Sequence, residues 1–279
     1  MLGSDKQYGA LAAPHLGTEL RGLVRSGRVY DLSFSITSET PYSGTTSPFS
    51  MRPKQRHDES PVGGAFGEAT EIIRMSAHVS THLDAICHVS ERVNDLPVLY
   101  GDIPAVQVEG EKGFTSLGVE LCPPILVRGV LLDIPGSKDL DVLPDCYGIT
   151  VEDIKTCLST QGTDVRAGDC VLVRTGFSRY RHCETARYVS VGAGPTPDAC
   201  VWLAQKGIAL TGSDTQSYEQ VPSSHAGHME LIRRRGIPML KQVNLDELAA
   251  DSVYEFLFIA LPLRLVGATA SPVTPIAVC

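Results

Sequence analysis

The sequence predicts a single α/β domain, on three observations. Two strongly apolar runs, Ile125–Asp133 and Cys170–Gly176, have the length and composition of buried strands. Between them, Thr150 supplies an N-cap and an acidic first turn to a segment that ends at Gly162, which is typical of a capped helix. The chain has 279 residues, a hydrophobic fraction of 43% and no internal repeat. This is enough apolar material for one large core.

Residues 1–28 are expected to form an N-terminal arm outside the domain. Four leucines (11, 16, 20 and 23) recur at loosely helical spacing among polar residues, which predicts packing on a surface or on a neighbouring subunit. The domain then covers 29–279 and begins with a strand at Val29–Ser33. Because no charged segment followed by an apolar run opens the chain, we expect a cytoplasmic protein without a signal peptide.

The stretch Met51–Thr70 is polar, charged and rich in glycine and proline. It predicts a long mobile loop that leads directly into Glu71–Met75. A loop of this size beside a site is often a lid or a subunit-exchange arm, and a tolerated surface insertion is the alternative.

The second half of the chain continues the alternation of strands and helices. Pro197 opens a helix after the N-cap Thr196, and Gly207 ends it. A short strand and a small polar loop follow, at the place where α/β proteins commonly put ligand contacts. The remaining expected elements are a helix over 225–235 and strands within 237–245, 255–265 and 272–278.

Charge and cysteine usage exclude several classes of protein. The net charge of −8, from 24 basic and 32 acidic residues without long runs of either sign, argues against nucleic-acid and anionic-membrane binding. The most apolar stretch, Phe256–Leu263, is too short to span a bilayer. Eight scattered cysteines without a C-x-x-C pair indicate reduced thiols. Cys87 adjoins His88, but adjacent side chains usually diverge, so a catalytic Cys–His pair is disfavoured.

One segment, Ser76–Ser90, concentrates metal-binding residue types: His78, His82, Asp84 and His88. On a straight strand the first two histidines would lie roughly 13 Å apart, and on a helix Asp84 would face away from them. A bend near Val79–Ser80 would bring His78, His82 and Asp84 to one ion, with His88 close by. A histidine-rich strand end without a metal is the alternative reading.

The same segment resembles the H-x-G-T-H-x-D-x-P-x-H signature of the metal-dependent cyclase family, which includes bacterial kynurenine formamidase, isatin hydrolase and trans-dienelactone hydrolase. Ser80 and Ile86 stand where the family has Gly and Pro. Further matches follow in order, at Gly212–Ser217 and in a C-terminal L-P-L-x-x-x-G segment where Thr269 and Ala270 replace Asp-Gly. The resemblance implies a swivelling β/β/α single domain with a mixed central sheet and a subunit interface near the site.

By the family pattern, His78, His82 and Asp84 hold one divalent cation per subunit, Mn²⁺ or Zn²⁺, with Gln242 as a further contact. In two-metal members an acidic residue occupies a position like that of Gln242, and a neutral Gln favours a single ion. His88 would carry a proton to or from the substrate, assisted by His228. The expected substrate-binding residues are Phe34, Tyr42, Phe49, Ser217 and His225.

The resemblance implies hydrolysis of a C–N bond in a cyclic or aryl-linked amide by a metal-bound hydroxide. The alternatives are a lactone hydrolase, a polyketide-type cyclase or dehydratase, and a non-catalytic metal-binding relative. The expected partners are a small-molecule substrate and further copies of the chain, in a homodimer or homotetramer, with no nucleic acid or membrane.

Overall fold

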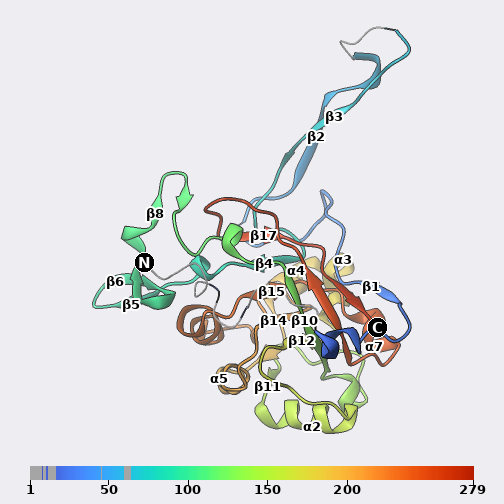
Figure 1. Ribbon diagram of the computed structural model, residues 1–279, viewed down its shortest axis with the longest axis vertical. Coiled ribbons are helices and arrows are strands. Elements are labelled where there is room, and N and C mark those ends of the chain that lie inside the picture. Colours follow the sequence, from blue (N-terminus) through green and yellow to red (C-terminus); the bar gives the residue numbers. More distant parts are fainter. Residues whose placement is uncertain (1–7, 9–10, 12–16, 45, 60–63) are drawn as a thin grey trace.

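A nine-stranded mixed sheet runs through the computed structural model, which describes residues 8, 11, 17–44, 46–59 and 64–279 (Figure 1). The strand order is β1-β18-β16-β10-β12-β14-β15-β4-β17. These strands are β1 (Val29–Asp31), β4 (His82–Asp84), β10 (Ile125–Asp133), β12 (Cys170–Arg174), β14 (Leu210–Ser213), β15 (Met239–Lys241), β16 (Glu255–Ala260), β17 (Ala270–Pro272) and β18 (Ile276–Val278).

Four neighbouring strands, β10, β12, β14 and β15, are parallel and form the middle of the sheet. Their apolar residues are buried, as expected where helices and loops cover both faces. The remaining strands pair antiparallel on both sides, with β16, β18 and β1 on one and β4 and β17 on the other. The expected α/β class with a mixed central sheet is confirmed.

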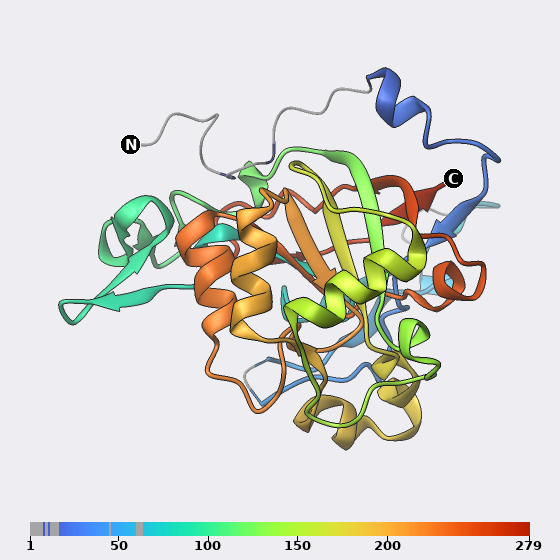
Figure 2. The same ribbon diagram turned by 90° about the horizontal axis from the view of Figure 1, so that it is seen from below.

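Three helical segments cover one face of the sheet (Figure 2). They are α2 (Val151–Gln161), α5 (Pro197–Gln205) and α6 (Ala226–His228), which continues into a π-helical turn at Met229–Arg234. The capping box expected at Thr150 is present, and Gly162 ends α2 with a φ of 65° that suits glycine. Within the described part of the chain, no helix is long and apolar enough to cross a membrane.

The opposite face is covered by loops, short strands and part of the N-terminal segment. Tyr8 and Leu11 are buried in the core on this side, and α1 (Thr18–Arg21) precedes β1. Residues 1–7, 9–10 and 12–16, which carry much of the expected arm, lie outside the described residues.

Several short elements were not expected from the sequence. They include the helices α3 (Tyr180–Cys183), α4 (Thr185–Ser190) and α7 (Asp246–Ala250). The expected strand at 272–278 is two strands, β17 and β18, which pair with different neighbours. Small two- and three-stranded sheets are formed by β5 (Glu91–Val93), β6 (Leu96–Leu99) and β7 (Ile103–Pro104), by β8 (Glu109–Gly110) and β9 (Gly113–Phe114), and by β11 (Gly148–Ile149) and β13 (Gly194–Pro195).

The ends of the segment expected to be a mobile loop belong to a two-stranded ribbon, in which β2 (Ser50–Gln55) pairs antiparallel with β3 (Thr70–Arg74); residues 60–63 of that segment lie outside the described residues. The ribbon projects far from the body of the molecule (Figure 1). The register pairs Met51 with Ile73 and shifts near Pro53. Because nearly every residue of both strands is exposed, the sequence lacks the polar–apolar alternation of a half-buried strand, and the ribbon could not be predicted from that pattern.

Candidate metal centre

A backbone bend at Ser80 brings His78 close to His82, which begins β4. Ser80 has a φ of 51°, in the left-handed region that non-glycine residues occupy at a cost of about 1 kcal/mol. Its hydroxyl donates to the carbonyl oxygen of Phe34 at 3.1 Å and accepts from Nη2 of Arg181 at 2.6 Å. These bonds offset the strain and hold the bend, without which His78 and His82 would lie too far apart to share one ion.

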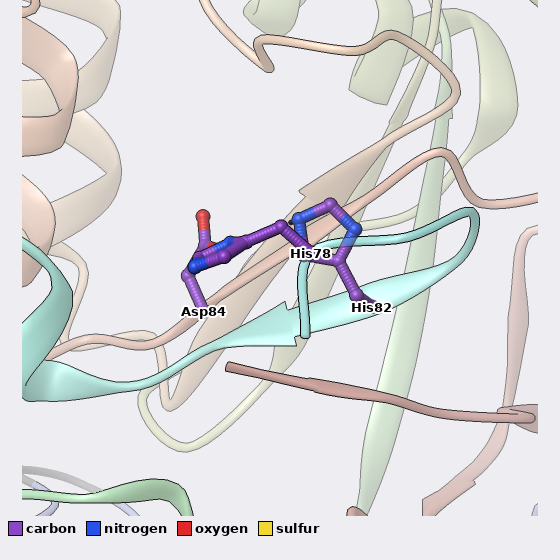
Figure 3. Close-up of side chains that lie close together, drawn as sticks. All are labelled: His78, His82 and Asp84. Atoms are coloured by element: carbon purple, nitrogen blue, oxygen red, sulfur yellow. Dashed lines mark hydrogen bonds and ion pairs between the residues drawn. The ribbon is translucent and has the colours of Figure 1, made fainter. Parts of the chain in front are cut away.

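The side chains of His78, His82 and Asp84 converge on one point (Figure 3). Nδ1 of His78 lies 2.8 Å, and Nε2 of His82 lies 3.4 Å, from Oδ1 of Asp84. Ligand atoms about 2.1 Å from a common ion lie roughly 3–3.4 Å apart in octahedral or tetrahedral geometry. The three donor atoms therefore have the spacing of ligands to one divalent cation.

Neighbouring groups orient both imidazoles and determine the tautomer of His82. Nδ1 of His82 lies 2.7 Å from the carbonyl oxygen of Ser80, which can only accept, so Nδ1 carries the proton and the lone pair of Nε2 faces the site. Nε2 of His78 lies 3.0 Å from Oγ1 of Thr269, which leaves Nδ1 toward Asp84. The donor set thus fits a divalent cation. Sequence analysis placed Thr269 in a turn and did not assign it this role.

The second oxygen of Asp84 faces Lys241, which sequence analysis did not single out. Nζ of Lys241 lies 3.4 Å from Oδ2 of Asp84, and both side chains are buried. Although burial opposes ionisation of Asp84, the neighbouring His88, Lys241, His78 and His82 hold its pKa well below the usual range. Asp84 is therefore an anion that faces a histidine pair on one side and an ammonium group on the other.

The strand register explains why Lys241 reaches the site. Lys241 pairs directly with His82 across the antiparallel β15–β4 ladder, and directly opposite residues point to the same face of a sheet. Gln242 follows the last residue of β15 with a φ of 52°, which departs from strand geometry, and its side chain is fully buried. Among the described residues its amide group has no hydrogen-bond partner, and the expectation that Gln242 contacts the metal stays a prediction.

The His228–Glu219 pair lies beside Lys241. Nδ1 of His228 forms a short hydrogen bond with Oε1 of Glu219, and Nε2 of His228 lies 2.6 Å from Nζ of Lys241. Burial opposes ionisation of Glu219, but hydrogen bonds from His228 and Gly227 lower its pKa to about 2. Glu219, which sequence analysis missed, therefore accepts the Nδ1 proton of His228, and Nε2 accepts from Lys241.

The three candidate metal ligands, His228 and Lys241 line one cavity of about 660 Å³. His88 lies in it with its ring centroid 4.4 Å from that of His78. Although His88 is exposed to solvent, desolvation by the surrounding atoms lowers its pKa to about 4 and leaves a neutral imidazole at pH 7. The rest of the lining is Ser43, Thr46, Ser76, His78, His82, Asp84, Val189, Gln216, Ser217, Val221, Ser223, His225, His228, Lys241 and Thr269.

The aromatic residues expected to bind substrate are not among the described residues that line this cavity. Phe34 lines a neighbouring pocket and lies under the guanidinium of Arg181, 4.7 Å from its ring centroid, so it supports the bend instead. Tyr42 is 51% exposed and Phe49 is half-buried, and neither is among the described residues that line the cavity. Cys87 is buried beside Ala268, and burial raises the pKa of its thiol to about 12, which disfavours a nucleophilic role.

The family model and the curated relatives that match this chain point to the same family. The Cyclase family model matches residues 30–220. Kynurenine formamidase of Bordetella pertussis is 26% identical over 247 residues, which covers 88% of this chain and 95% of that protein. The kynurenine formamidase of Paracidovorax citrulli is 40% identical over 103 residues, or 37% of this chain and 44% of that protein.

Two solved structures extend the likeness to the whole fold. A crystal structure described as a novel cyclase is 27% identical, covers 100% of this chain and 96% of its own, and superposes with a TM-score of 0.89. Isatin hydrolase A from Labrenzia aggregata, bound to benzyl benzoate, is 25% identical. The match covers 92% of this chain and 94% of that chain, with a TM-score of 0.65.

Proposed function

This chain belongs to the Cyclase family, and from that we propose that it is a metal-dependent hydrolase of cyclic or aryl-linked amides. One observation carries the proposal: His78, His82 and Asp84 present correctly spaced donor atoms, with the ring of His82 oriented by Ser80 and the ring of His78 by Thr269. Relatives with the names kynurenine formamidase and isatin hydrolase support an amide substrate in place of a lactone.

We propose that the site holds one divalent cation. Two neutral imidazoles and one carboxylate suit both Mn²⁺ and Zn²⁺, and the carboxylate ligand together with the open cavity favours Mn²⁺. When bound, the ion supplies Lewis acidity, which polarises a carbonyl group and lowers the pKa of water. The chain's own residues must then position the substrate and move the proton.

His88 is the proposed proton acceptor. It lies in the cavity with its ring centroid 4.4 Å from that of His78, where the lone pair of a neutral imidazole can take a proton from water. His228 is already hydrogen-bonded through both nitrogens, which suits a role in holding the charged groups around the substrate. Ser217 and His225, which also line the cavity, are proposed as polar contacts to the substrate, with Val189 and Val221 as the apolar surface.

We further propose that the protein is a cytoplasmic homo-oligomer, a dimer or a tetramer. The projecting β2–β3 ribbon supports association, because an isolated two-stranded ribbon is marginally stable in water and this one exposes Met51 and Ile73. All eight cysteines are free, and the five buried ones have no disulfide role, which agrees with a reducing compartment.

Elemental analysis of the purified protein, followed by a substrate panel, tests the proposal. Metal-loaded protein is offered isatin, N-formylkynurenine, simple lactones and imides, with acid release recorded. We expect about one divalent ion per chain and turnover of at least one amide. Faster turnover of the lactones would favour a lactone hydrolase, and bound metal without any turnover would favour a non-catalytic binding protein.

A further inference from the structure

We propose that the ammonium group of Lys241 occupies the position of a second divalent cation, so that the chain binds one ion and supplies the other positive charge itself. The inference rests on the cation site of the proposed function. It concerns a residue that neither the family signature nor the sequence pattern singled out.

The atoms around Nζ of Lys241 are those that would bind a metal. Oδ2 of Asp84 lies at 3.4 Å, Nε2 of His228 at 2.6 Å and the carbonyl oxygen of Ser217 at 3.1 Å. A carboxylate, an imidazole and a carbonyl are ordinary ligands of divalent cations. Since Oδ1 of the same carboxylate faces His78 and His82, Asp84 has the arrangement of a carboxylate that bridges two cations.

The hydrogen-bond pattern makes Lys241 the donor at this position. His228 donates from Nδ1 to Glu219, so its Nε2 bears a lone pair and can only accept from Lys241. The carbonyl oxygen of Ser217 also only accepts. Nζ thus faces two hydrogen-bond acceptors and a carboxylate oxygen, as suits an ammonium group, and an ion at this place would have to displace it.

The other cluster of possible ligands does not provide a separate second site. Glu219, His225 and His228 lie close together, but both nitrogens of His228 are engaged and Glu219 already accepts from the backbone of Gly227 and His228. Only loss of Lys241 would release Nε2 of His228. The number of ions bound should therefore depend on the residue at 241.

The test is metal stoichiometry. Wild type, Lys241→Glu and Lys241→Gln are saturated with Mn²⁺, passed through gel filtration and analysed for Mn²⁺ per chain, and the Mn²⁺ EPR spectrum is recorded. We expect one ion with the spectrum of isolated Mn²⁺ in wild type. Lys241→Glu, which adds a ligand in place of the ammonium group, should bind two ions with the broadened spectrum of a spin-coupled pair. Lys241→Gln should bind the second ion more weakly.

Lys155→Glu is the matched control, because Lys155 is exposed on α2 and the charge change is the same. It should behave as wild type. Two tightly bound ions in wild type would overturn the inference, as would a single ion in both well-folded Lys241 variants, with folding checked by circular dichroism. No bound ion in any form would instead refute the His78–His82–Asp84 site of the proposed function, and the inference with it.

Discussion

His82 and His88 lie in the same cavity, but their surroundings suit different roles, a metal ligand for His82 and a general base for His88. Both nitrogens of His82 are committed, one to the carbonyl of Ser80 and one toward Asp84, whereas the ring of His88 is exposed beside His78. We expect His82→Ala to lose bound metal and activity together. We expect His88→Ala to keep its metal and to lose about 10²- to 10⁴-fold in turnover, the usual range for a general base.

Elemental analysis and steady-state kinetics on the same preparations check both outcomes. Full metal content in His82→Ala would refute its assignment as a ligand. Unchanged kinetics in His88→Ala would remove it from the reaction.

Ser80 illustrates two opposing effects at one residue. Glycine would relieve about 1 kcal/mol of left-handed strain but would remove the hydroxyl that bonds Arg181, whose side chain is fully buried. A hydrogen bond to a buried charged group contributes about 1.5–3 kcal/mol, so the loss outweighs the relief. We expect Ser80→Gly to lower the free energy of unfolding by about 1 kcal/mol, and Ser80→Ala by about 2–3 kcal/mol because it keeps the strain.

Urea unfolding of the three proteins measures this order. A Ser80→Gly variant more stable than wild type would show that backbone strain, and not the bond to Arg181, dominates at this position.

At the scale of single residues, the sequence predicted the site only as far as local spacing allowed. His78, His82, Asp84 and His88 lie within eleven residues, and the structure places them together. Lys241 on β15 and Thr269 immediately before β17 are far away in sequence, and their contacts depend on strand register. A shift of one residue turns a side chain to the other face, and no local pattern in 237–245 fixed that register.

At the scale of elements, a buried cation joins three strands. Arg128 on β10 binds Asp169, which precedes β12, at 2.7 Å, and Glu255 at the start of β16 at 2.8 Å. Arg128 is 5% exposed and Asp169 is 2% exposed. Removal of one partner from such a group leaves an uncompensated buried charge, which costs about 3–5 kcal/mol.

The cost of losing Arg128 should depend on pH. Burial raises the pKa of Asp169 to about 6, despite its bonds to Arg166 and Arg128. Because the pKa is raised, the folded state binds the carboxyl proton of Asp169 more tightly than the unfolded state does. The resulting stabilisation of the fold is complete below about pH 4 and is lost as the pH rises through about 6. We expect Arg128→Met to be destabilised by about 3–5 kcal/mol at pH 8, where Asp169 is ionised, and by less at pH 5.

Denaturant unfolding at the two pH values tests this expectation. Arg166→Met is the control, because Arg166 is about half exposed and its surface pair with Asp164 contributes little at either pH. An equal loss at both pH values in Arg128→Met would show that Asp169 does not respond to its burial.

The elements that sequence analysis predicted well are those with a strong local signal. β10 has the expected bounds, and α2 and α5 begin after their predicted N-caps. The short helices α3, α4 and α7 have four to six residues, too few for a clear helical period, and tertiary contacts decide them.

At the scale of the whole molecule, the fold class followed from the alternation of buried strands and capped helices, but the ribbon did not. Within the part of the chain that the structure describes, the ribbon exposes apolar side chains on β2, on β3 and near its tip: Met51, Phe66, Ile72 and Ile73. Exposed apolar groups on a projecting pair of strands favour burial against another surface. In the proposed homo-oligomer, that other surface belongs to a second copy of the chain.

The ribbon's register gives a clean way to remove it. Met51 and Ile73 are directly paired, so replacing residues 52–72 by Asn-Gly leaves a short hairpin with a favourable two-residue turn. We expect the shortened chain to be a monomer by light scattering, while the full chain is a dimer or tetramer. Metal content should stay at the full chain's value, because His78 and His82 lie outside the deleted segment. An unchanged molar mass in the shortened chain, or a monomeric full chain, would contradict association through the ribbon.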